Sequence, residues 1–234
     1  MSPAPICRLT STRTRPRYRP VLVRPRSPKG RAVETARRLA EEYPDAACAL
    51  VHRNPFELLA ATILSAQAND EQVNKVTPAL FARFPAAADL AGASTAELED
   101  LIKTLGLFRS KARSLVGMAA ALTDRHGGEV PSSMEDLTAL PGVGRKTANV
   151  VRSVALGEPG LPVDTHVTRL SRRLGMTEQT DPVKIEHELN AMIPPTDRGA
   201  FSLRLILHGR QTCIARRPRC PDCVLCDFCP SSLV

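Results

Sequence analysis

Residues 140–151 read LPGVGRKTANVV and join two segments of helical periodicity. A proline and two glycines form a four-residue link, and the apolar spacing on either side predicts helices over about 133–140 and 145–156. A link this short makes the two helices a tight antiparallel pair. The sequence therefore predicts a helical hairpin whose second helix begins with Arg145 and Lys146.

The glycines of this link suit close contact with a ligand. Gly142 and Gly144 allow positive φ and a close backbone approach, and the unpaired N–H groups that open a helix bind phosphate well. We expect the backbone of Gly142, Val143, Gly144 and Arg145 to bind phosphate without reading base sequence. An ordinary helix turn is the alternative, because PGVG alone is a weak signal.

Lys146 lies in the first turn of the second helix, and no other lysine occurs between Lys111 and Lys184. The positive end of the helix dipole disfavours a charged ammonium there, which favours the neutral, nucleophilic amine. The chain has six lysines and 26 arginines, and an arginine cannot supply a neutral amine. Most lysines are solvated surface groups, so the position in the hairpin is what makes Lys146 a candidate nucleophile.

A partner carboxylate occurs in LPVDTHVTRL, residues 161–170. The second hairpin helix runs roughly 15 Å outward from Lys146 at 1.5 Å per residue. The link 157–163 spans up to about 23 Å, which is enough to bring Asp164 back beside the lysine. An N-cap role for Asp164 is the alternative, and both roles are compatible because a cap fixes the position of the carboxylate.

The cysteines cluster near the end of the chain. Disulfides are disfavoured inside a cell, and an odd number of cysteines cannot all pair. Four thiolates suit either a structural zinc or a [4Fe–4S] cluster, and the spacing alone leaves both open. Of seven cysteines in the chain, five lie in the last 22 residues: Cys213, Cys220, Cys223, Cys226 and Cys229.

The loop IARRPR lies between the first two of these cysteines and contains Arg216, Arg217 and Arg219. Ligands at both ends of the loop would hold it rigid and turn its guanidinium groups outward. The metal then has a structural use, which is to present phosphate contacts without redox chemistry. A solvated basic surface is the alternative.

The net charge of +8 is unevenly distributed. Residues 1–31 contain nine Lys and Arg and no acid, so the remaining residues carry 23 bases and 24 acids. Clustering of bases is therefore more informative than the total charge. Aromatic residues are scarce, with no Trp, two Tyr and six Phe, which disfavours a stacking platform for single-stranded nucleic acid.

Residues 1–30 combine six prolines with this excess of arginine and predict a disordered basic arm. The prolines oppose the amphipathic helix of an organelle transit peptide. No run of about 18 apolar residues and no secretory signal is present, so we expect an intracellular protein. A bacterial cytoplasmic, nucleoid-associated protein ranks first, and an organelle remains open.

From residue 31 onward, apolar residues recur at helical spacing, which predicts an all-α protein. Good N-caps precede several segments: Asn54 before Pro55, Ser94 with Glu97, Ser132 with Glu135, and Asp181 before Pro182. About ten helices are predicted, near 31–43, 55–66, 70–82, 95–105, 109–126, 133–140, 145–156, 165–174, 182–193 and 198–209.

Taken together and in order, five stretches resemble the endonuclease III family of helix-hairpin-helix DNA glycosylases with an attached lyase activity. The resemblance covers about residues 31–230, and the set is specific although each stretch alone is weak. The stretches are NPFELLAATILSAQANDEQVNK (54–75), LIKTLGLFRSKA (101–112), LPGVGRKTANVV (140–151), VDTHVTRL (163–170) and LILHGRQTCIARRPRCPDC (205–223).

The resemblance implies base excision repair of oxidised pyrimidines in duplex DNA. Lys146 matches the lysine that attacks the sugar C1′ and forms a Schiff base, and Asp164 matches the aspartate that activates it, before β-elimination cuts 3′ to the abasic site. An adenine-mismatch glycosylase of the same superfamily is disfavoured by the presence of Lys146. A noncatalytic DNA-binding module is a third reading.

The resemblance also assigns residues that fill the gap left by a flipped base. Gln67, in LSAQ, would enter the stack, and Leu107, in the GL turn, would wedge the opposite strand. Residue chemistry alone leaves ordinary alternatives, because Gln67 could cap the helix beginning near Asp70 and Leu107 could belong to the core.

The family's cysteine spacing matches Cys213, Cys220, Cys223 and Cys229 as ligands of a [4Fe–4S] cluster. Cys226 is then extra and could compete with Cys229. The family fold implies a six-helix domain at 48–158, with the hairpin at 133–156, and a cluster domain made of 31–47 plus 159–234. We expect a monomer with its active site in the cleft between the domains.

Overall fold

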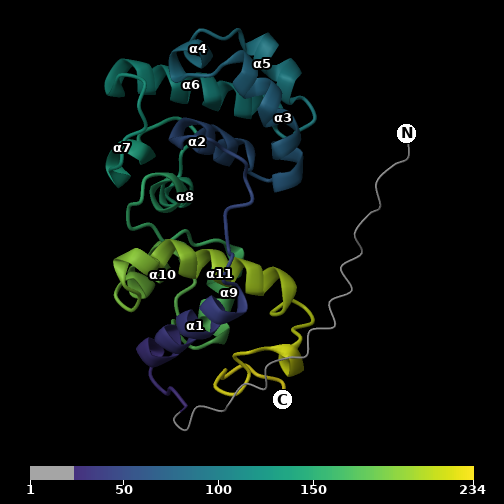
Figure 1. Cartoon of the computed structure of the whole chain (residues 1–234), viewed down its shortest axis with the longest axis vertical. Coiled ribbons are helices and arrows are strands. Elements are labelled where there is room, and N and C mark those ends of the chain that lie inside the picture. Colours follow the sequence, from purple (N-terminus) through teal and green to yellow (C-terminus); the bar gives the residue numbers. More distant parts are fainter. Residues whose placement is uncertain (1–23) are drawn as a thin grey trace, which may run out of the picture.

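The computed structural model describes residues 24–234, and within this range the secondary structure is entirely helical (Figure 1). The α-helices are α1 (Pro28–Glu42), α2 (Pro55–Leu64), α3 (Asp70–Arg83), α4 (Ala87–Ala91), α5 (Thr95–Ile102), α6 (Phe108–His126), α7 (Met134–Thr138), α8 (Arg145–Ala155), α9 (Thr165–Arg173), α10 (Pro182–Asn190) and α11 (Arg198–Gln211). Two short 3₁₀ helices, η1 (Pro195–Asp197) and η2 (Cys220–Asp222), complete the set. The all-α prediction is confirmed.

Local signals in the sequence explain most helix starts. Asn54, Ser94 and Asp181 cap α2, α5 and α10 with their side chains, as predicted. The predicted cap at Ser132 is wrong, because Ser133 accepts the hydrogen bond from Asp136 N and α7 begins one residue later. Two adjacent serines, each followed three residues later by an acid, make this cap ambiguous from sequence.

The first hydrophobic core is built by α2 to α8. Helix α2 is its centre, since nine of its ten residues are buried. A helix that is apolar all round belongs inside a protein. Apolar side chains from the surrounding helices close the core around it, among them Leu80, Leu98, Leu115 and Val151. The hairpin α7–α8 lies at one edge of this core, next to the second core.

The second core joins the two ends of the described chain. Leu39 of α1 packs with Leu170 of α9, Phe201 of α11 and Leu225 near the C-terminus. The predicted domains, 48–158 and 31–47 plus 159–234, follow this division of apolar residues, and we keep those boundaries as a proposal. Helix α1 already begins at Pro28, and residues 1–23 of the predicted arm lie outside the described residues.

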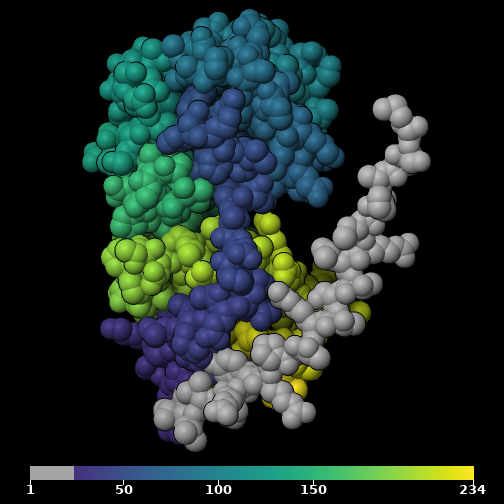
Figure 2. All heavy atoms as spheres, in the orientation of Figure 1, coloured from purple at the N-terminus to yellow at the C-terminus, as the bar shows by residue number. Residues whose placement is uncertain are grey.

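The two cores are stacked along the long axis of the molecule (Figure 1). One link runs from α1 to α2 and a second from α8 to α9, so the chain crosses between the cores twice. In Figure 2 the outline of the molecule narrows between them. No helix among residues 24–234 is long and apolar enough to cross a membrane.

Candidate active site and cysteine centre

The hairpin turn requires glycine at one position. Gly142 has φ +78°, and a Cβ at this position would lie 2.7 Å from Cβ of Ser114 on α6. Val143 is buried, and its N–H donates to the carbonyl of Leu140 at 3.1 Å. Val143 therefore anchors the turn to the first core, and its N–H already has a partner within the protein.

The first turn of α8 is open to a ligand. Gly144 is the N-cap and supplies no side-chain hydrogen bond, so the N–H groups that open α8 lack a side-chain cap. Lys146 is exposed in this turn. The neighbouring guanidinium of Arg145 is not free, because Glu186 of α10 binds it through two hydrogen bonds of 2.8 Å.

The link between α8 and α9, which precedes Asp164, packs against α8. A Cβ on Gly160 would lie 2.4 Å from the carbonyl oxygen of Asn149, so this link packs directly on α8. The N–H of Leu161 donates to Oδ1 of Asn149 at 3.2 Å. Asn149 follows Lys146 by three residues and Leu161 precedes Asp164 by three, so this contact lies three residues along the chain from each candidate residue.

Asp164 is the N-cap of α9. Its Oδ1 accepts from the N–H groups of His166 and Val167, both at 2.8 Å. Both bonds use the same oxygen, which leaves Oδ2 available for a ligand. The alternative role predicted for this residue is thus confirmed, and the cap fixes the carboxylate at the beginning of a helix.

Charged groups from both cores lie near Lys146 and Asp164. Arg210 of α11 pairs with Asp70 of α3 at 3.6 Å, and this ion pair joins the two cores. Burial chiefly raises the pKa of the Cys48 thiol, which the carboxylate of Asp70 raises further and the ammonium of Lys146 lowers. These influences place the lysine, the thiol and the cross-core ion pair near one another.

His166 is a further titratable side chain near these groups. Burial chiefly lowers its pKa, the charge of Asp164 raises it, and the charges of Arg169 and Arg210 lower it. Arg210 thus acts on a residue beside Asp164 while it pairs with Asp70. Groups that can carry charge therefore come from both cores to this part of the molecule.

Gln67 and Leu107 share an unusual backbone conformation. They have φ of +54° and +60°, and among the described residues they are the non-glycine residues with positive φ. Both side chains are exposed, and Leu107 is 59% exposed, so it is not a core residue. Asn69, not Gln67, caps α3. A non-glycine residue in this region costs about 1–3 kcal/mol, and such strain concentrates at functional sites.

The predicted cysteine ligands surround one cavity. All five cysteines of the C-terminal segment line it and have free thiols, together with His208 and Arg173. Polar donors are directed at the sulfur atoms. His208 Nε2 lies 3.2 Å from Cys223 Sγ, Leu225 N donates to the same sulfur at 3.4 Å, and Arg173 Nη1 donates to Cys213 Sγ at 3.4 Å.

These surroundings suit thiolates held by a metal centre. Burial chiefly raises the pKa of Cys223 to about 12, so its free thiol is protonated, and a metal would replace that proton. Donors aimed at sulfur stabilise a ligating thiolate and tune a cluster. Among residues 24–234, no three His, Cys, Asp or Glu side chains meet as the ligands of a single ion do.

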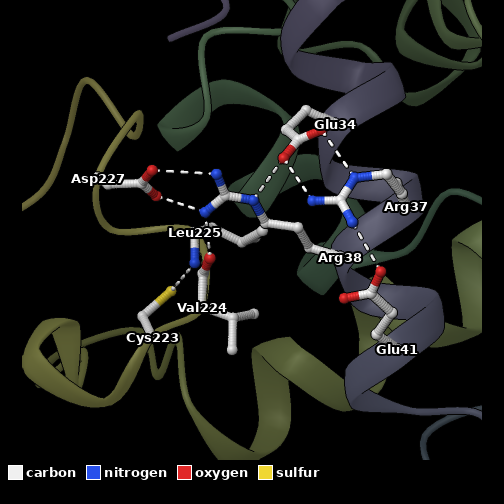
Figure 3. Close-up of polar contacts among 8 residues, drawn as sticks. All are labelled: Glu34, Arg37, Arg38, Glu41, Cys223, Val224, Leu225 and Asp227. Carbon is white, nitrogen blue, oxygen red and sulfur yellow. Dashed lines mark hydrogen bonds and ion pairs between the residues drawn. The ribbon is translucent and has the colours of Figure 1, made fainter. Parts of the chain in front are cut away.

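Side chains of helix α1 reach across to the cysteine loop and bind it (Figure 3). Arg38, only 2% exposed, donates to the carbonyl of Val224 at 2.7 Å and binds the carboxylate of Asp227 through both terminal nitrogens. Its Nε donates to Glu34, and its guanidinium lies 4.9 Å from the ring centroid of Phe228. A helix from the N-terminal end therefore fixes the loop that ends in Cys229.

The arginine loop between Cys213 and Cys220 is held at its base. Arg173 of α9 donates to the carbonyls of Ile214 and Ala215 at 3.1 and 2.7 Å. Arg219 donates to the carbonyl of Gln211 at 2.6 Å. The side chains of Arg216, Arg217 and Arg219 are exposed, so a rigid base carries an outward basic group.

Sequence reasoning missed the residues that join the cores around this site. Glu186, Asn149 and Asp70 were not singled out, because each interaction joins segments far apart in sequence. Glu186 is 4% exposed and Asn149 2% exposed. The available signal was weak. Glu186 lies on the apolar face of α10, and Asn149 lies inside the apolar run of α8. Each is a polar residue at a position where the helical pattern predicts burial.

Comparison with known proteins identifies the family. Residues 60–195 match the HhH-GPD superfamily of base excision DNA repair proteins. The chain is 51% identical over 207 residues to endonuclease III of Synechocystis sp., covering 88% of this chain and 94% of the relative. It is 44% identical over 193 residues to endonuclease III of Bacillus subtilis, covering 82% and 88%.

The fold agrees with solved structures of such relatives. A trapped endonuclease III–DNA covalent intermediate superposes with a TM-score of 0.82 at 45% identity, covering 87% of this chain and 96% of the other. A thermostable thymine-DNA glycosylase superposes with a TM-score of 0.78 at 22% identity, which concerns the fold alone.

Proposed function

This chain belongs to the endonuclease III family of the HhH-GPD superfamily, and we propose that Lys146 is its nucleophile and Asp164 the carboxylate that assists it. The protein is a bifunctional DNA glycosylase and AP lyase of base excision repair that binds damaged duplex DNA. The observation that carries the residue assignment is the hydrogen bond of Leu161 N to Asn149, which draws the link before Asp164 along α8 toward Lys146.

The chemistry follows from these two groups. The amine of Lys146 attacks C1′ of the damaged nucleotide, the C1′–N bond breaks, and the base leaves with the bonding electrons. The sugar ring opens to a protonated Schiff base, loss of a proton from C2′ follows, and the C3′–O bond breaks with the 3′ phosphate as the leaving group. Oδ2 of Asp164 accepts the ammonium proton and stabilises the positive charge that develops on the sugar.

Gln67 and Leu107 supply the duplex-opening function in this proposal. A base must leave the stack before an amine can reach its sugar, and the vacated space must be filled. Both residues are exposed, lie at the ends of loops beside α2 and α6, and hold a strained backbone that fixes their direction. Gln67 would enter the lesion strand gap, and Leu107 would wedge the opposite strand.

Two elements bind phosphate. The first turn of α8, with Gly142 and Gly144 before it, offers uncapped N–H groups, whereas Val143 contributes the anchor of the turn. Residue 145 contributes its backbone N–H, because its side chain is bound to Glu186. The second element is the exposed arginine loop of Arg216, Arg217 and Arg219.

Replacing Arg216, Arg217 and Arg219 with Ala is expected to weaken DNA binding and flatten its salt dependence. Each phosphate contact adds about 0.9 to the magnitude of the slope of log K against log salt, so three contacts add up to about 2.7. Fluorescence anisotropy with an abasic-analogue duplex over a salt series measures this slope. The control variant replaces the distant exposed pair Arg83 and Arg125 with Ala. An unchanged slope for the loop variant would show that the loop does not bind phosphate.

We propose a [4Fe–4S] cluster bound by Cys213, Cys220, Cys223 and Cys229. The support is the set of free thiols around one cavity and the donors directed at their sulfurs. When bound, the cluster supplies a rigid cross-link of the C-terminal segment and no step of the lyase reaction. Cys226 lines the same cavity and remains the competing fifth thiol.

We also place the enzyme in the bacterial cytoplasm, associated with the nucleoid. The six cysteines of the described residues are all free, which is typical of a reducing compartment. The enzyme would act there as a monomer on duplex DNA.

A panel of duplexes is expected to show the lesion class. Duplexes with thymine glycol, dihydrouracil or an abasic site should be cut 3′ to the lesion, and an A:G mismatch should remain intact. A denaturing gel resolves the β-elimination product from an unbroken strand. Release of adenine from the mismatch without strand cutting would instead support an adenine-mismatch glycosylase, and binding without any product would support a noncatalytic module.

A further inference from the structure

Glu186 of α10 binds the helix that carries the nucleophile. Its carboxylate accepts from Nε and Nη2 of Arg145, both at 2.8 Å, which is a bidentate pair. The carboxylate is buried, and this hydrogen-bonded pairing chiefly raises the pKa of Arg145 above its ordinary value. Arg145, directly before Lys146, is therefore bound to α10 of the second core.

The same carboxylate accepts a third hydrogen bond from α8. Nδ2 of Asn149 donates to Glu186 Oε2 at 2.9 Å, while Oδ1 of Asn149 accepts from Leu161 N. Arg145 and Asn149 are four residues apart and so lie on one face of the helix. One buried group thus fixes both the rotation of α8 about its axis and, through Asn149, the link that leads to Asp164.

The two ends of α8 are held to the second core in different ways. Near its C-terminal end, Ser153 packs against α11, where a Cβ on Gly199 would lie 2.7 Å from the Ser153 Cβ. Its first turn has no side-chain cap. The hydrogen bonds of Glu186 with Arg145 connect the second core to this first turn, where Lys146 lies.

We propose that Glu186 is a positioning residue for the lyase reaction, fixing through Arg145 and Asn149 the rotation of α8 that presents Lys146 to the sugar and to Asp164. The inference rests on the proposed role of Lys146. A displacement of about 1 Å of a reacting group costs roughly 10²-fold in rate. Loss of this carboxylate should therefore slow Schiff-base formation more than it weakens DNA binding, because the arginine loop, Gln67 and Leu107 do not lie on α8.

The test is Glu186→Gln under single-turnover conditions with excess enzyme and an abasic-site duplex. We expect borohydride-trappable adduct to form about 10²-fold more slowly, with a much smaller change in Kd for a duplex carrying the uncleavable tetrahydrofuran analogue. Gln keeps the size of the side chain and an acceptor for Asn149, but removes the charge. An unchanged rate of adduct formation would overturn the proposal.

Glu57→Gln is the matched control. Glu57 is a similarly buried carboxylate that accepts from Nε of Arg53 at 2.8 Å, but its partner lies four residues before it and not on the hairpin helix α8. Both variants lose a buried charge of an ion pair and should be destabilised, so rates are measured below both melting temperatures. If Glu57→Gln slows adduct formation as much as Glu186→Gln does, the effect is general destabilisation and the positioning role is wrong.

Arg145→Lys provides a second variant if Glu186→Gln folds poorly. Lys cannot make the bidentate pair, so this variant should also slow the adduct step. The double variant should be no slower than the slower single variant, because both changes break one network. Rates that multiply would contradict the proposal. A wild-type protein that forms no reducible adduct would instead refute the assigned role of Lys146 itself.

Discussion

Lys146→Ala is expected to abolish the covalent adduct with abasic DNA and to lower the rate of strand cutting by on the order of 10⁴-fold or more, because the variant lacks the nucleophile. Lys146 is exposed at the open first turn of α8, so truncation removes an amine without disturbing the core. The melting temperature and the affinity for an abasic-analogue duplex should stay close to those of the wild type. A gel assay under single-turnover conditions measures the cutting rate.

Asp164→Asn is the informative comparison for this variant. Asn can still cap α9 with its side-chain oxygen, so the backbone of the helix start is kept. It cannot take a proton or offset positive charge, and a general base contributes about 10²–10⁴-fold. We expect slower turnover with binding largely kept. A Lys146→Ala enzyme that cuts abasic DNA faster than Asp164→Asn would contradict both roles.

Cys229→Ala is expected to produce a colourless, unstable protein, because it removes one of four proposed cluster ligands. Loss of a metal centre is among the changes that cost more than about 4 kcal/mol, which corresponds to a fall of about 8–16 °C in Tm for a domain of this size. The helix α1 should loosen as well, since Arg38 is bound to the loop ending at Cys229. Visible absorption, iron and sulfide content and thermal unfolding measure these effects.

Cys226→Ala is the matched control, since Cys226 lines the same cavity and is also half-buried. Its loss should leave iron and sulfide content unchanged and alter the free energy of unfolding by less than about 1 kcal/mol. The reverse pattern, in which Cys226→Ala loses the cluster and Cys229→Ala keeps it, would show that the ligand set is Cys213, Cys220, Cys223 and Cys226. If both variants keep their iron and sulfide, the result would argue against a four-cysteine cluster.

The helices and the order of site residues along the chain could be predicted because their signals are local. The helix starts after Asn54, Ser94 and Asp181 were predicted from their capping side chains, and the hairpin was predicted from its four-residue link. The link after α8 is long enough to bring Asp164 back beside Lys146, and that placement stays a prediction. Helix α4 was missed because five residues are too few to show periodicity.

Interactions between distant segments could not be predicted. Arg145 is a plausible phosphate ligand by sequence, yet Glu186, 41 residues later, binds its guanidinium. The side chain of Val143 lies in the first core, and its N–H is used within the turn. Gln67 and Leu107 carry positive φ, a property that residue type alone does not suggest. A buried carboxylate and a strained backbone become visible only when the packing around them is known.

The most direct measurement of the central claim is the position of the covalent bond to DNA. The wild-type protein is mixed with an abasic-site duplex, reduced with borohydride, digested with nuclease and protease, and analysed by mass spectrometry. The assigned roles predict a reduced sugar remnant on Nζ of Lys146, in the peptide that includes ThrAlaAsnVal after it. A remnant on another lysine or on the N-terminal amine, or no adduct at all, would contradict Lys146 as the nucleophile.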